Sequence, residues 1–220
     1  MDRLDYAHAN RQRYLDWVGA VSQAPYTAVE LLEFAAISAH CPMAKAIAGW
    51  RATRDMGLGV VEIAEALNAA GVFAPFNKAG YIAEYRRLQP MPSMPFREYR
   101  RDTKLAGLGY CKLSFACCLI DPLNADVVCL DTHILQVYMG HRPSEREVAR
   151  VYNQLSTYER IEGQLLAEAG QVGLPPFAHQ WAVWDWKRAR VDHKPPLDHS
   201  FLWRGGQSQC QLPLFSSLEV

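Results

Sequence analysis

Apolar side chains recur at the three- and four-residue spacing of a helix along most of this chain. In residues 27–54 an apolar run follows Thr27, a candidate N-cap, and is broken near Pro42, so the pattern predicts two helices that meet there. Residues 60–70 carry a shorter apolar face and end at Gly71, where a C-terminal glycine cap belongs. No segment alternates convincingly with the period of two that a half-buried strand requires. The pattern therefore predicts an all-α protein.

Prolines and capping residues divide the second half of the chain. Three prolines in residues 90–95 remove backbone donors and favour extended geometry, so this stretch is predicted to be an internal linker. An apolar helix is predicted from about 110 to 120, and a short helix at 133–139 after an N-cap at Asp131 or Thr132. The pattern predicts three further helices, at 144–157, 160–170 and 177–190.

The composition limits the class of protein. The chain has 220 residues, half of them apolar, which is enough to form one large domain or two lobes that share a cleft. No stretch approaches the ~18 apolar residues of a spanning helix, and the first residues are charged, so we expect neither a membrane nor a secretory segment. The six cysteines form no CxxC pair, which favours reduced thiols and a cytoplasmic location.

The segment of residues 105–112 is the first candidate for chemistry. Gly107 and Gly109 flank one apolar residue, which lets the backbone turn sharply between two short helices. The helix that follows presents free backbone amides at its N-terminus, and such amides bind a phosphate without a basic side chain. Ordinary tight turns also contain GxG, but the sequence Asp131-Thr132-His133 further along favours the phosphate-binding interpretation.

Together these motifs resemble those of the helix-hairpin-helix DNA glycosylase superfamily, which includes endonuclease III and the 8-oxoguanine glycosylases. The family's hairpin L-P-G-V-G-R-K-T-A and its V-D-T-H sequence are similar to LAGLGYCKL and CLDTH here, at matching separation. The resemblance extends to LLEFAAISAHCPMAKAI, to Gly71-Val72-Phe73 with Asn77-Lys78-Ala79, and to the segment from His179 to Pro195, and it covers roughly residues 27–202.

The resemblance implies an all-α fold of two helical lobes with a cleft between them. We expect an N-terminal helical extension in residues 1–26 and a six-helix core in residues 27–140, with the helix-hairpin-helix near 98–120. Residues 141–204 are expected to complete the second lobe, and residues 205–220 to form a flexible tail.

The resemblance also implies that Asp131 is a catalytic residue of a DNA glycosylase, which removes a damaged or modified base after flipping it out of the duplex. Loss of a base builds positive, oxocarbenium-like charge on the deoxyribose. A carboxylate beside the sugar stabilises that charge or activates the incoming nucleophile. The alternative is that Asp131 is only the N-cap of the next helix.

A lysine near the hairpin is a second catalytic candidate. Bifunctional members of the family carry a Schiff-base lysine two residues after the second glycine, where this chain has Cys111, and Lys112 follows one position later. One residue rotates a side chain by about 100° around a helix. Two outcomes are therefore open. Either Lys112 misses the site and Cys111 takes the lysine position, which makes the enzyme monofunctional, or the hairpin is one residue longer and Lys112 reaches the site. In the second case its amine forms a Schiff base and permits strand cleavage at the abasic site.

Further residues are expected to hold the DNA. The resemblance assigns phosphate contacts to the backbone from Gly107 through Tyr110 to Cys111, and to His133. It places His40 where a polar side chain fills the gap left by the flipped base.

The base pocket has weaker candidates. Trp181, Trp184 and Asp185 lie together on a predicted helix, but two tryptophans on one helical face are more often part of a core. Basic clusters at 97–104 and 187–194 supply local positive charge, whereas the 23 basic and 23 acidic residues cancel overall and give no general basicity.

Iron-sulfur members of the family bind a cluster with four cysteines after the last core helix, where this chain reads VDHKPPLDHS. We therefore expect no cluster, metal or other cofactor. Near the C-terminus, QLPLF resembles the pentapeptide that binds the bacterial sliding clamp, with Gln211, Leu212, Leu214 and Phe215 as contacts. A clamp partner places the protein at the nucleoid of a bacterial or phage-infected cell. A tail that packs on its own domain is the alternative.

Two other functions are compatible with the same motifs. Phage relatives of this fold transfer an amino acid or amine onto an activated 5-hydroxymethyl pyrimidine, and the absent cluster and shifted lysine fit such a base-modifying transferase. A non-catalytic hairpin module that only binds DNA has no need of the Asp131 carboxylate. The sequence does not identify the base.

Overall fold

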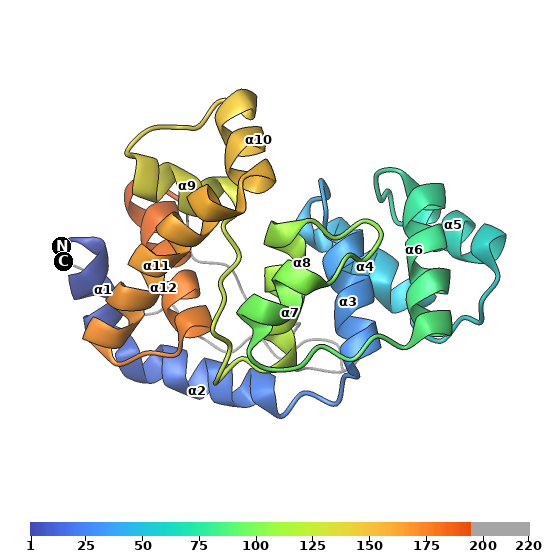
Figure 1. Ribbon diagram of the computed structural model, residues 1–220, viewed down its shortest axis with the longest axis horizontal. Coiled ribbons are helices and arrows are strands. Elements are labelled where there is room, and N and C mark those ends of the chain that lie inside the picture. Colours follow the sequence, from blue (N-terminus) through green and yellow to red (C-terminus); the bar gives the residue numbers. More distant parts are fainter. Residues whose placement is uncertain (195–220) are drawn as a thin grey trace.

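Twelve helices make up the regular structure of residues 1–194, which are the residues that the computed structural model describes (Figure 1). They are α1 (Arg3–Ala9), α2 (Arg11–Ser22), α3 (Ala28–Ile37), α4 (Met43–Thr53), α5 (Val60–Ala69), α6 (Pro75–Leu88), α7 (Phe96–Asp102), α8 (Tyr110–Ile120), α9 (Thr132–Met139), α10 (Glu145–Asn153), α11 (Leu155–Val172) and α12 (Pro176–Arg190). Within this range there is no strand, which confirms the all-α prediction. A search of the same residues found no helix of the length and apolarity that crossing a membrane requires.

Local signals in the sequence set several helix ends. Thr27 and Ser144 each form a capping box, in which the hydroxyl accepts from the amide three residues on and the glutamate there accepts from the cap amide. The predicted ends of α8 are the observed ones, and Asp131 is the N-cap of α9, as expected. Side-chain capping thus sets the starts of α3, α9 and α10.

The helices form two groups that share one hydrophobic core. In the first group α3 packs against α4, α6 and α8, and α5 packs against α4 and α6. In the second, α12 packs against α1, α2, α9 and α11. Figure 1 shows the two groups side by side, with α2 running along the bottom of the view and contacting α8 of the first group. The predicted two-lobed arrangement is confirmed.

The division of the chain between the lobes differs from the predicted one. Residues 27–140 contain seven helices, α3 to α9, rather than six. The apolar face of α9 packs on α12, so α9 lies with the C-terminal helices. The chain therefore crosses between the groups before α9 and not at residue 140.

Two helices lie where the hydrophobic pattern gave no clear prediction. α6 has polar residues over much of its length and begins with Pro75 in its first turn, where the fixed φ of proline suits a helix. α7 consists of the basic segment after the proline-rich linker, and its Arg100 is fully buried. Because an arginine stands at a buried position of α7, the hydrophobic pattern of the sequence does not show which face of this helix is buried.

Arg100 is buried because it forms an ion pair inside the core. Its guanidinium donates to both carboxylate oxygens of Glu162 in α11, at 2.7 and 2.9 Å, and both side chains are fully buried. Arg100 also donates to Ser114 of α8, and Glu162 accepts from the amide of Val128 at 3.0 Å. The pair thus joins three helices to the segment that leads to Asp131.

A second network holds the N-terminal helix. Glu168 of α11 accepts hydrogen bonds from Arg3, from Tyr138 at 2.7 Å and from His179 at 3.3 Å. Burial alone raises the pKa of Glu168, but these hydrogen bonds outweigh it and lower the pKa to about 2. The ionised carboxylate is therefore the form that the fold stabilises.

We expect this network to fail in acid. A carboxylate whose pKa is lower in the folded than in the unfolded protein stabilises the fold above its unfolded pKa of 4.5, and this stability is lost as the pH falls toward 2. Glu168→Gln should thus lower the free energy of unfolding at pH 6, and the difference from wild type should shrink as the pH falls from 4.5 to 2. Urea unfolding across this pH range measures the difference. A constant difference would contradict the assignment.

Candidate functional site

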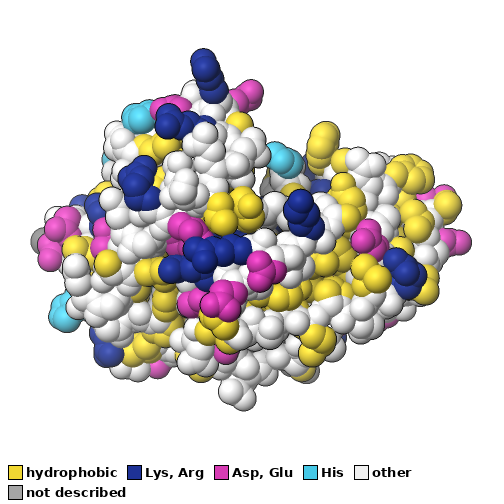
Figure 2. Space-filling model, viewed as in Figure 1, with side chains coloured by type: hydrophobic (Ala, Val, Ile, Leu, Met, Phe, Trp, Pro, Cys, Tyr) yellow, Lys and Arg dark blue, Asp and Glu magenta, His cyan; other side chains and the backbone are white. Residues whose placement is uncertain are grey.

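A cavity of about 550 Å³ opens where the two groups of helices meet. Its walls come from the α3–α4 turn, the start of α6, the glycine hairpin, the start of α9 and the face of α10 that carries Val148 and Tyr152. Figure 2 shows that Lys and Arg side chains are scattered over this side of the molecule and form no continuous band. Segments far apart in the sequence therefore build one site.

The glycine hairpin forms one wall of the cavity. Gly107 has a φ of 76°, a left-handed conformation, and a Cβ added there would lie 2.3 Å from the ring of Tyr81. The hydroxyl of Tyr85 donates to the carbonyl of Ala106, which ties the hairpin to α6. Gly109 is the N-cap of α8 and offers no capping side chain, so the first amides of α8 are available to a ligand.

The two glycines should respond differently to substitution. Gly107→Ala combines a disfavoured φ with a collision against Tyr81, so we expect a loss of about 2–4 kcal/mol of unfolding free energy. Gly109→Ala is the matched control, because its φ is −74° and an added Cβ meets nothing within 4 Å. Its stability should stay within about 0.5 kcal/mol of wild type. Equal losses in denaturant unfolding would refute this account of the hairpin.

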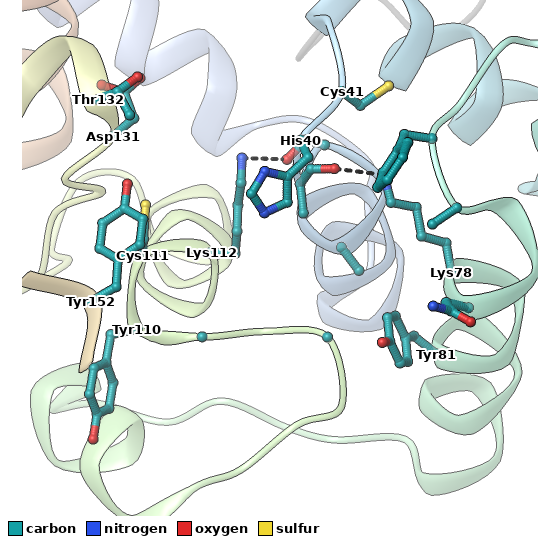
Figure 3. A pocket seen from close by; sticks show the side chains of 18 of the residues that line it. His40, Cys41, Lys78, Tyr81, Tyr110, Cys111, Lys112, Asp131, Thr132 and Tyr152 are labelled. Atoms are coloured by element: carbon teal, nitrogen blue, oxygen red, sulfur yellow. Dashed lines mark hydrogen bonds between the residues drawn. The ribbon is translucent and has the colours of Figure 1, made fainter. Parts of the chain in front are cut away.

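Asp131 lies on the cavity wall at the start of α9. Its Oδ1 accepts from the amide of Ile134 at 2.8 Å, so it is an N-cap as well as a cavity residue. The two sequence interpretations of Asp131 are thus compatible, since one carboxylate can cap the helix and still face the cavity (Figure 3).

The extended segment before Asp131 is fixed by side chains from the second group of helices. The amide of Cys129 donates to Gln180 at 2.8 Å, and the amide of Leu130 donates to the hydroxyl of Tyr158 at 3.1 Å. Tyr152 donates to the carbonyl of Leu130 at 2.9 Å. The position of Asp131 is therefore set by long-range contacts that the sequence does not reveal.

Lys112 and Cys111 both line the cavity but face different sides of it. The amine of Lys112 donates to the hydroxyl of Ser38 at 2.9 Å, and Figure 3 shows it next to His40. Cys111 lies on the side of Tyr152, and its sulfur is 3.4 Å from that of Cys129. The position two residues after the second glycine, on the Asp131 side, is therefore occupied by the cysteine.

His40 projects from the α3–α4 turn at the cavity rim and has a left-handed φ of 52°. The turn is held by Lys78 of α6, whose buried amine donates to the carbonyls of Ile37 and Ala39, both at 2.7 Å. Burial lowers the pKa of Lys78, and the nearby charge of Lys112 acts in the same direction. Sequence reasoning gave Lys78 no role beyond its place in the resemblance.

His133 is exposed at the start of α9 and is not among the residues that line the cavity. The buried amine of Lys187 lies 3.2 Å from its Nδ1, and the same amine donates to both carboxylate oxygens of Asp192 at 2.8 and 2.9 Å. A lysine amine only donates, so Nδ1 accepts and Nε2 carries the proton. His133 therefore presents a hydrogen-bond donor.

None of the three α12 residues predicted to form the base pocket, Trp181, Trp184 and Asp185, lines the cavity. Asp185 is fully buried and accepts from the hydroxyl of Tyr14 at 2.8 Å, and Trp181 packs its ring against those of Trp17 and Phe177. Trp184 is half-buried against His133, with ring centroids 5.7 Å apart. These residues join α12 to its neighbours and are not among the cavity-lining residues, because the large aromatic rings complete the core.

Three aromatic residues of the cavity wall were not predicted as site residues. Phe73 lies at the rim with 66% of its surface exposed, although aromatic side chains are usually covered. Tyr81 and Tyr152 line the cavity from α6 and α10. An aromatic residue directly after Gly71-Val72 was the only signal, and the sequence alone did not indicate its exposure.

Within residues 1–194, no group of three or more His, Cys, Asp or Glu side chains could hold a metal ion. The predicted clamp-binding residues Gln211, Leu212, Leu214 and Phe215 lie outside the described residues, and their role stays a prediction.

Comparisons with known proteins identify the fold. No family model and no curated protein sequence matches the chain significantly. Among solved structures, the 8-oxoguanine DNA glycosylase of Thermotoga maritima matches with a TM-score of 0.61 at 19% identity, over 84% of this chain and 93% of that one. The Methanocaldococcus jannaschii 8-oxoguanine glycosylase/lyase, in complex with 15mer DNA containing 8-oxoguanine, matches with a TM-score of 0.63 at 19% identity, over 90% of this chain and 100% of that one. The chain therefore has the helix-hairpin-helix fold of the 8-oxoguanine DNA glycosylases, as its motifs predicted.

Proposed function

We propose that this protein is a DNA glycosylase that removes a damaged or modified base. The observation that carries the proposal is that Asp131 and the uncapped hairpin helix share one cavity. A volume of about 550 Å³ lies within the usual range for small-ligand pockets and gives room for one flipped base. The hairpin amides lie where they could hold a phosphate of the same strand.

Asp131 acts in this proposal on the sugar. As the bond to the base breaks, positive charge develops on the deoxyribose, and a nearby carboxylate stabilises it or activates water. The hydrogen bond from Ile134 and the fixed segment before Asp131 hold the carboxylate in place. Such preorganisation costs no rearrangement during the reaction.

We further propose that base removal occurs by hydrolysis and without a Schiff base. Cys111 occupies the position of the lysine in bifunctional relatives, and a thiol does not form a Schiff base. The Lys112 amine is bound to Ser38 on the opposite side of the cavity. There it could donate to an acceptor atom of the flipped base.

The rim of the cavity supplies contacts to the opened duplex. His40 and Phe73 project from two different segments, and His133 presents an Nε2 donor near the start of α9. An exposed aromatic ring can stack on a base that has lost its partner, and a polar ring can occupy the vacated space. These residues bind DNA in the proposal and take no part in bond cleavage.

Mass spectrometry of base release tests the function. The full chain is incubated with duplexes that each carry one damaged or 5-substituted base, including 8-oxoguanine because the structural neighbours are 8-oxoguanine glycosylases. Release of a free base, with loss of its mass from the DNA, is the expected result. Borohydride is added in parallel and should trap no adduct. A trapped adduct that Lys112→Gln abolishes would contradict hydrolysis without a Schiff base.

A base-modifying transferase is the second candidate, and the cysteine at the lysine position favours it, because transfer onto a base needs no Schiff-base lysine. The same experiment separates the two. Mass gained on DNA that carries an activated 5-hydroxymethyl pyrimidine, in the presence of amino acids or amines, with no base lost, would replace the glycosylase proposal. Binding without any change in mass would indicate a DNA-binding module.

A further inference from the structure

A pair of thiols lies behind the cavity wall and has no part in the proposed reaction. Cys111 is the second residue of α8, and Cys129 lies in the extended segment two residues before Asp131. Their sulfur atoms are 3.4 Å apart, and both cysteines are buried and reduced. A disulfide bond is about 2.05 Å long, so the two thiols are in contact but not bonded.

Cys111 is the member of the pair that a small solute can reach. It lines the cavity, whereas Cys129, Cys117 and Cys118 are not among the cavity-lining residues. Cys118 is further engaged, because its thiol donates to the carbonyl of Val127 at 3.1 Å. Of the four buried thiols, that of Cys111 is therefore the one that a reagent in the cavity can reach, and the half-buried Cys41 lines the cavity as well.

The surroundings also make Cys111 the more reactive thiol. The hydrogen bond between the two sulfurs lowers the pKa of Cys111, and the charge of Lys112 acts in the same direction against the effect of burial. The same hydrogen bond raises the pKa of Cys129. Burial raises the pKa of Cys117 to about 12 and also raises that of Cys118, so those two thiols stay protonated.

We propose that Cys111 and Cys129 form an intramolecular disulfide when hydrogen peroxide enters the cavity. The Cys111 thiolate attacks one peroxide oxygen, which breaks the O–O bond and gives a sulfenic acid and a hydroxide, and this hydroxide takes up the proton that Cys111 had lost and becomes water. The sulfur of Cys129 then attacks the sulfenic sulfur, the S–S bond forms, and the displaced hydroxide takes up the thiol proton and leaves as water. Two thiols are oxidised, and one peroxide is reduced to two molecules of water.

The bond joins the hairpin helix to the segment that ends at Asp131. The sulfurs must approach by about 1.4 Å, from 3.4 Å to the length of a disulfide. Gln180 and Tyr158 already fix the amides of Cys129 and Leu130, so any backbone movement that accompanies the bond falls on the start of α8, which forms the cavity wall. This consequence rests on the proposed function: oxidation should lower base release at least about tenfold, and a thiol reductant should restore it.

Peptide mapping tests the bond itself. The full chain is treated with hydrogen peroxide, remaining thiols are blocked with N-ethylmaleimide, and trypsin cuts after Lys112 and so separates the two cysteines. The expected product is the peptide of Cys111 linked to the peptide of Cys129, in a protein lighter by two hydrogen atoms. Cys129→Ser should abolish the link, whereas Cys117→Ser and Cys118→Ser are matched controls that should retain it.

The outcomes separate this proposal from the proposed function. No link in the wild-type protein, a link that survives in Cys129→Ser, or oxidation of Cys111 that stops at a sulfinic acid would each overturn the disulfide. Mapping needs no enzymatic activity, so a link found in a protein that releases no base would refute only the proposed function. Thermal melting of each reduced variant shows whether it folds before it is oxidised.

Discussion

Asp131→Asn is expected to lower the rate of base release by about 10³-fold or more, while the protein still folds and binds DNA. The amide that replaces the carboxylate carries no charge to stabilise the developing oxocarbenium ion. Asparagine is as good an N-cap as aspartate, so α9 should keep its hydrogen bond from Ile134. The substitution thus removes the charge and retains the cap.

Single-turnover base release and DNA affinity measure the two functions of Asp131 separately. Ser144→Asn is the matched control, because it exchanges the N-cap of α10, which is not among the cavity-lining residues, and should leave the rate unchanged. Unaltered release by Asp131→Asn would sink the catalytic assignment. If Asp131→Asn lowered the melting temperature and the DNA affinity together with the rate of base release, Asp131 would be only a helix cap.

Arg100→Met is expected to cost about 3–5 kcal/mol of unfolding free energy. It removes both hydrogen bonds from Arg100 to the buried Glu162 and leaves Arg97, at 3.9 Å, as the nearby cation, and a poorly compensated buried charge is strongly destabilising. Because Glu162 also accepts from the amide of Val128, the change should loosen the segment before Asp131 as well. Urea unfolding measures the loss.

The neighbouring arginine supplies the control for this prediction. Arg101 also forms an ion pair with a glutamate of α11, Glu159, at 2.8 Å, but 45% of its side chain is exposed. Arg101→Met should cost less than about 1 kcal/mol, since exposed ion pairs contribute little. If both variants lost the same amount, burial would not be the reason for the effect of Arg100.

The sequence predicted the helices whose ends are marked by local chemistry. The capping box at Thr27, the glycine at the start of α8 and the Asp131 cap of α9 act within a few residues, so they are visible in the sequence. The sequence of α6 has no clear apolar face, and that of α7 is interrupted by a buried charge. The buried charge of Arg100 disrupts the pattern of α7, because its partner Glu162 lies 62 residues away.

The residues of the candidate site also fall into those that local sequence signals predict and those that they do not. Gly107, Gly109 and Asp131, which the motifs had singled out, line the cavity, and each acts through the conformation of its own turn or helix end. Trp181 and Asp185 were placed in the wrong environment, because helical spacing indicates a shared face and not what covers it. The exposure of Phe73 could not be inferred either, because Phe73 lies in the connection between α5 and α6, where helical spacing gives no information.

By itself the sequence determined the all-α fold, the glycine hairpin and the carboxylate at the start of α9, because these depend on backbone preferences and hydrogen bonds over a few residues. Only the tertiary structure decided that Lys112 faces Ser38 and that Cys111 faces Cys129. The direction of a side chain from a helix start depends on how that helix packs, and here α8 is held by Arg100 and α3. Packing of distant segments therefore selected which residue stands beside Asp131.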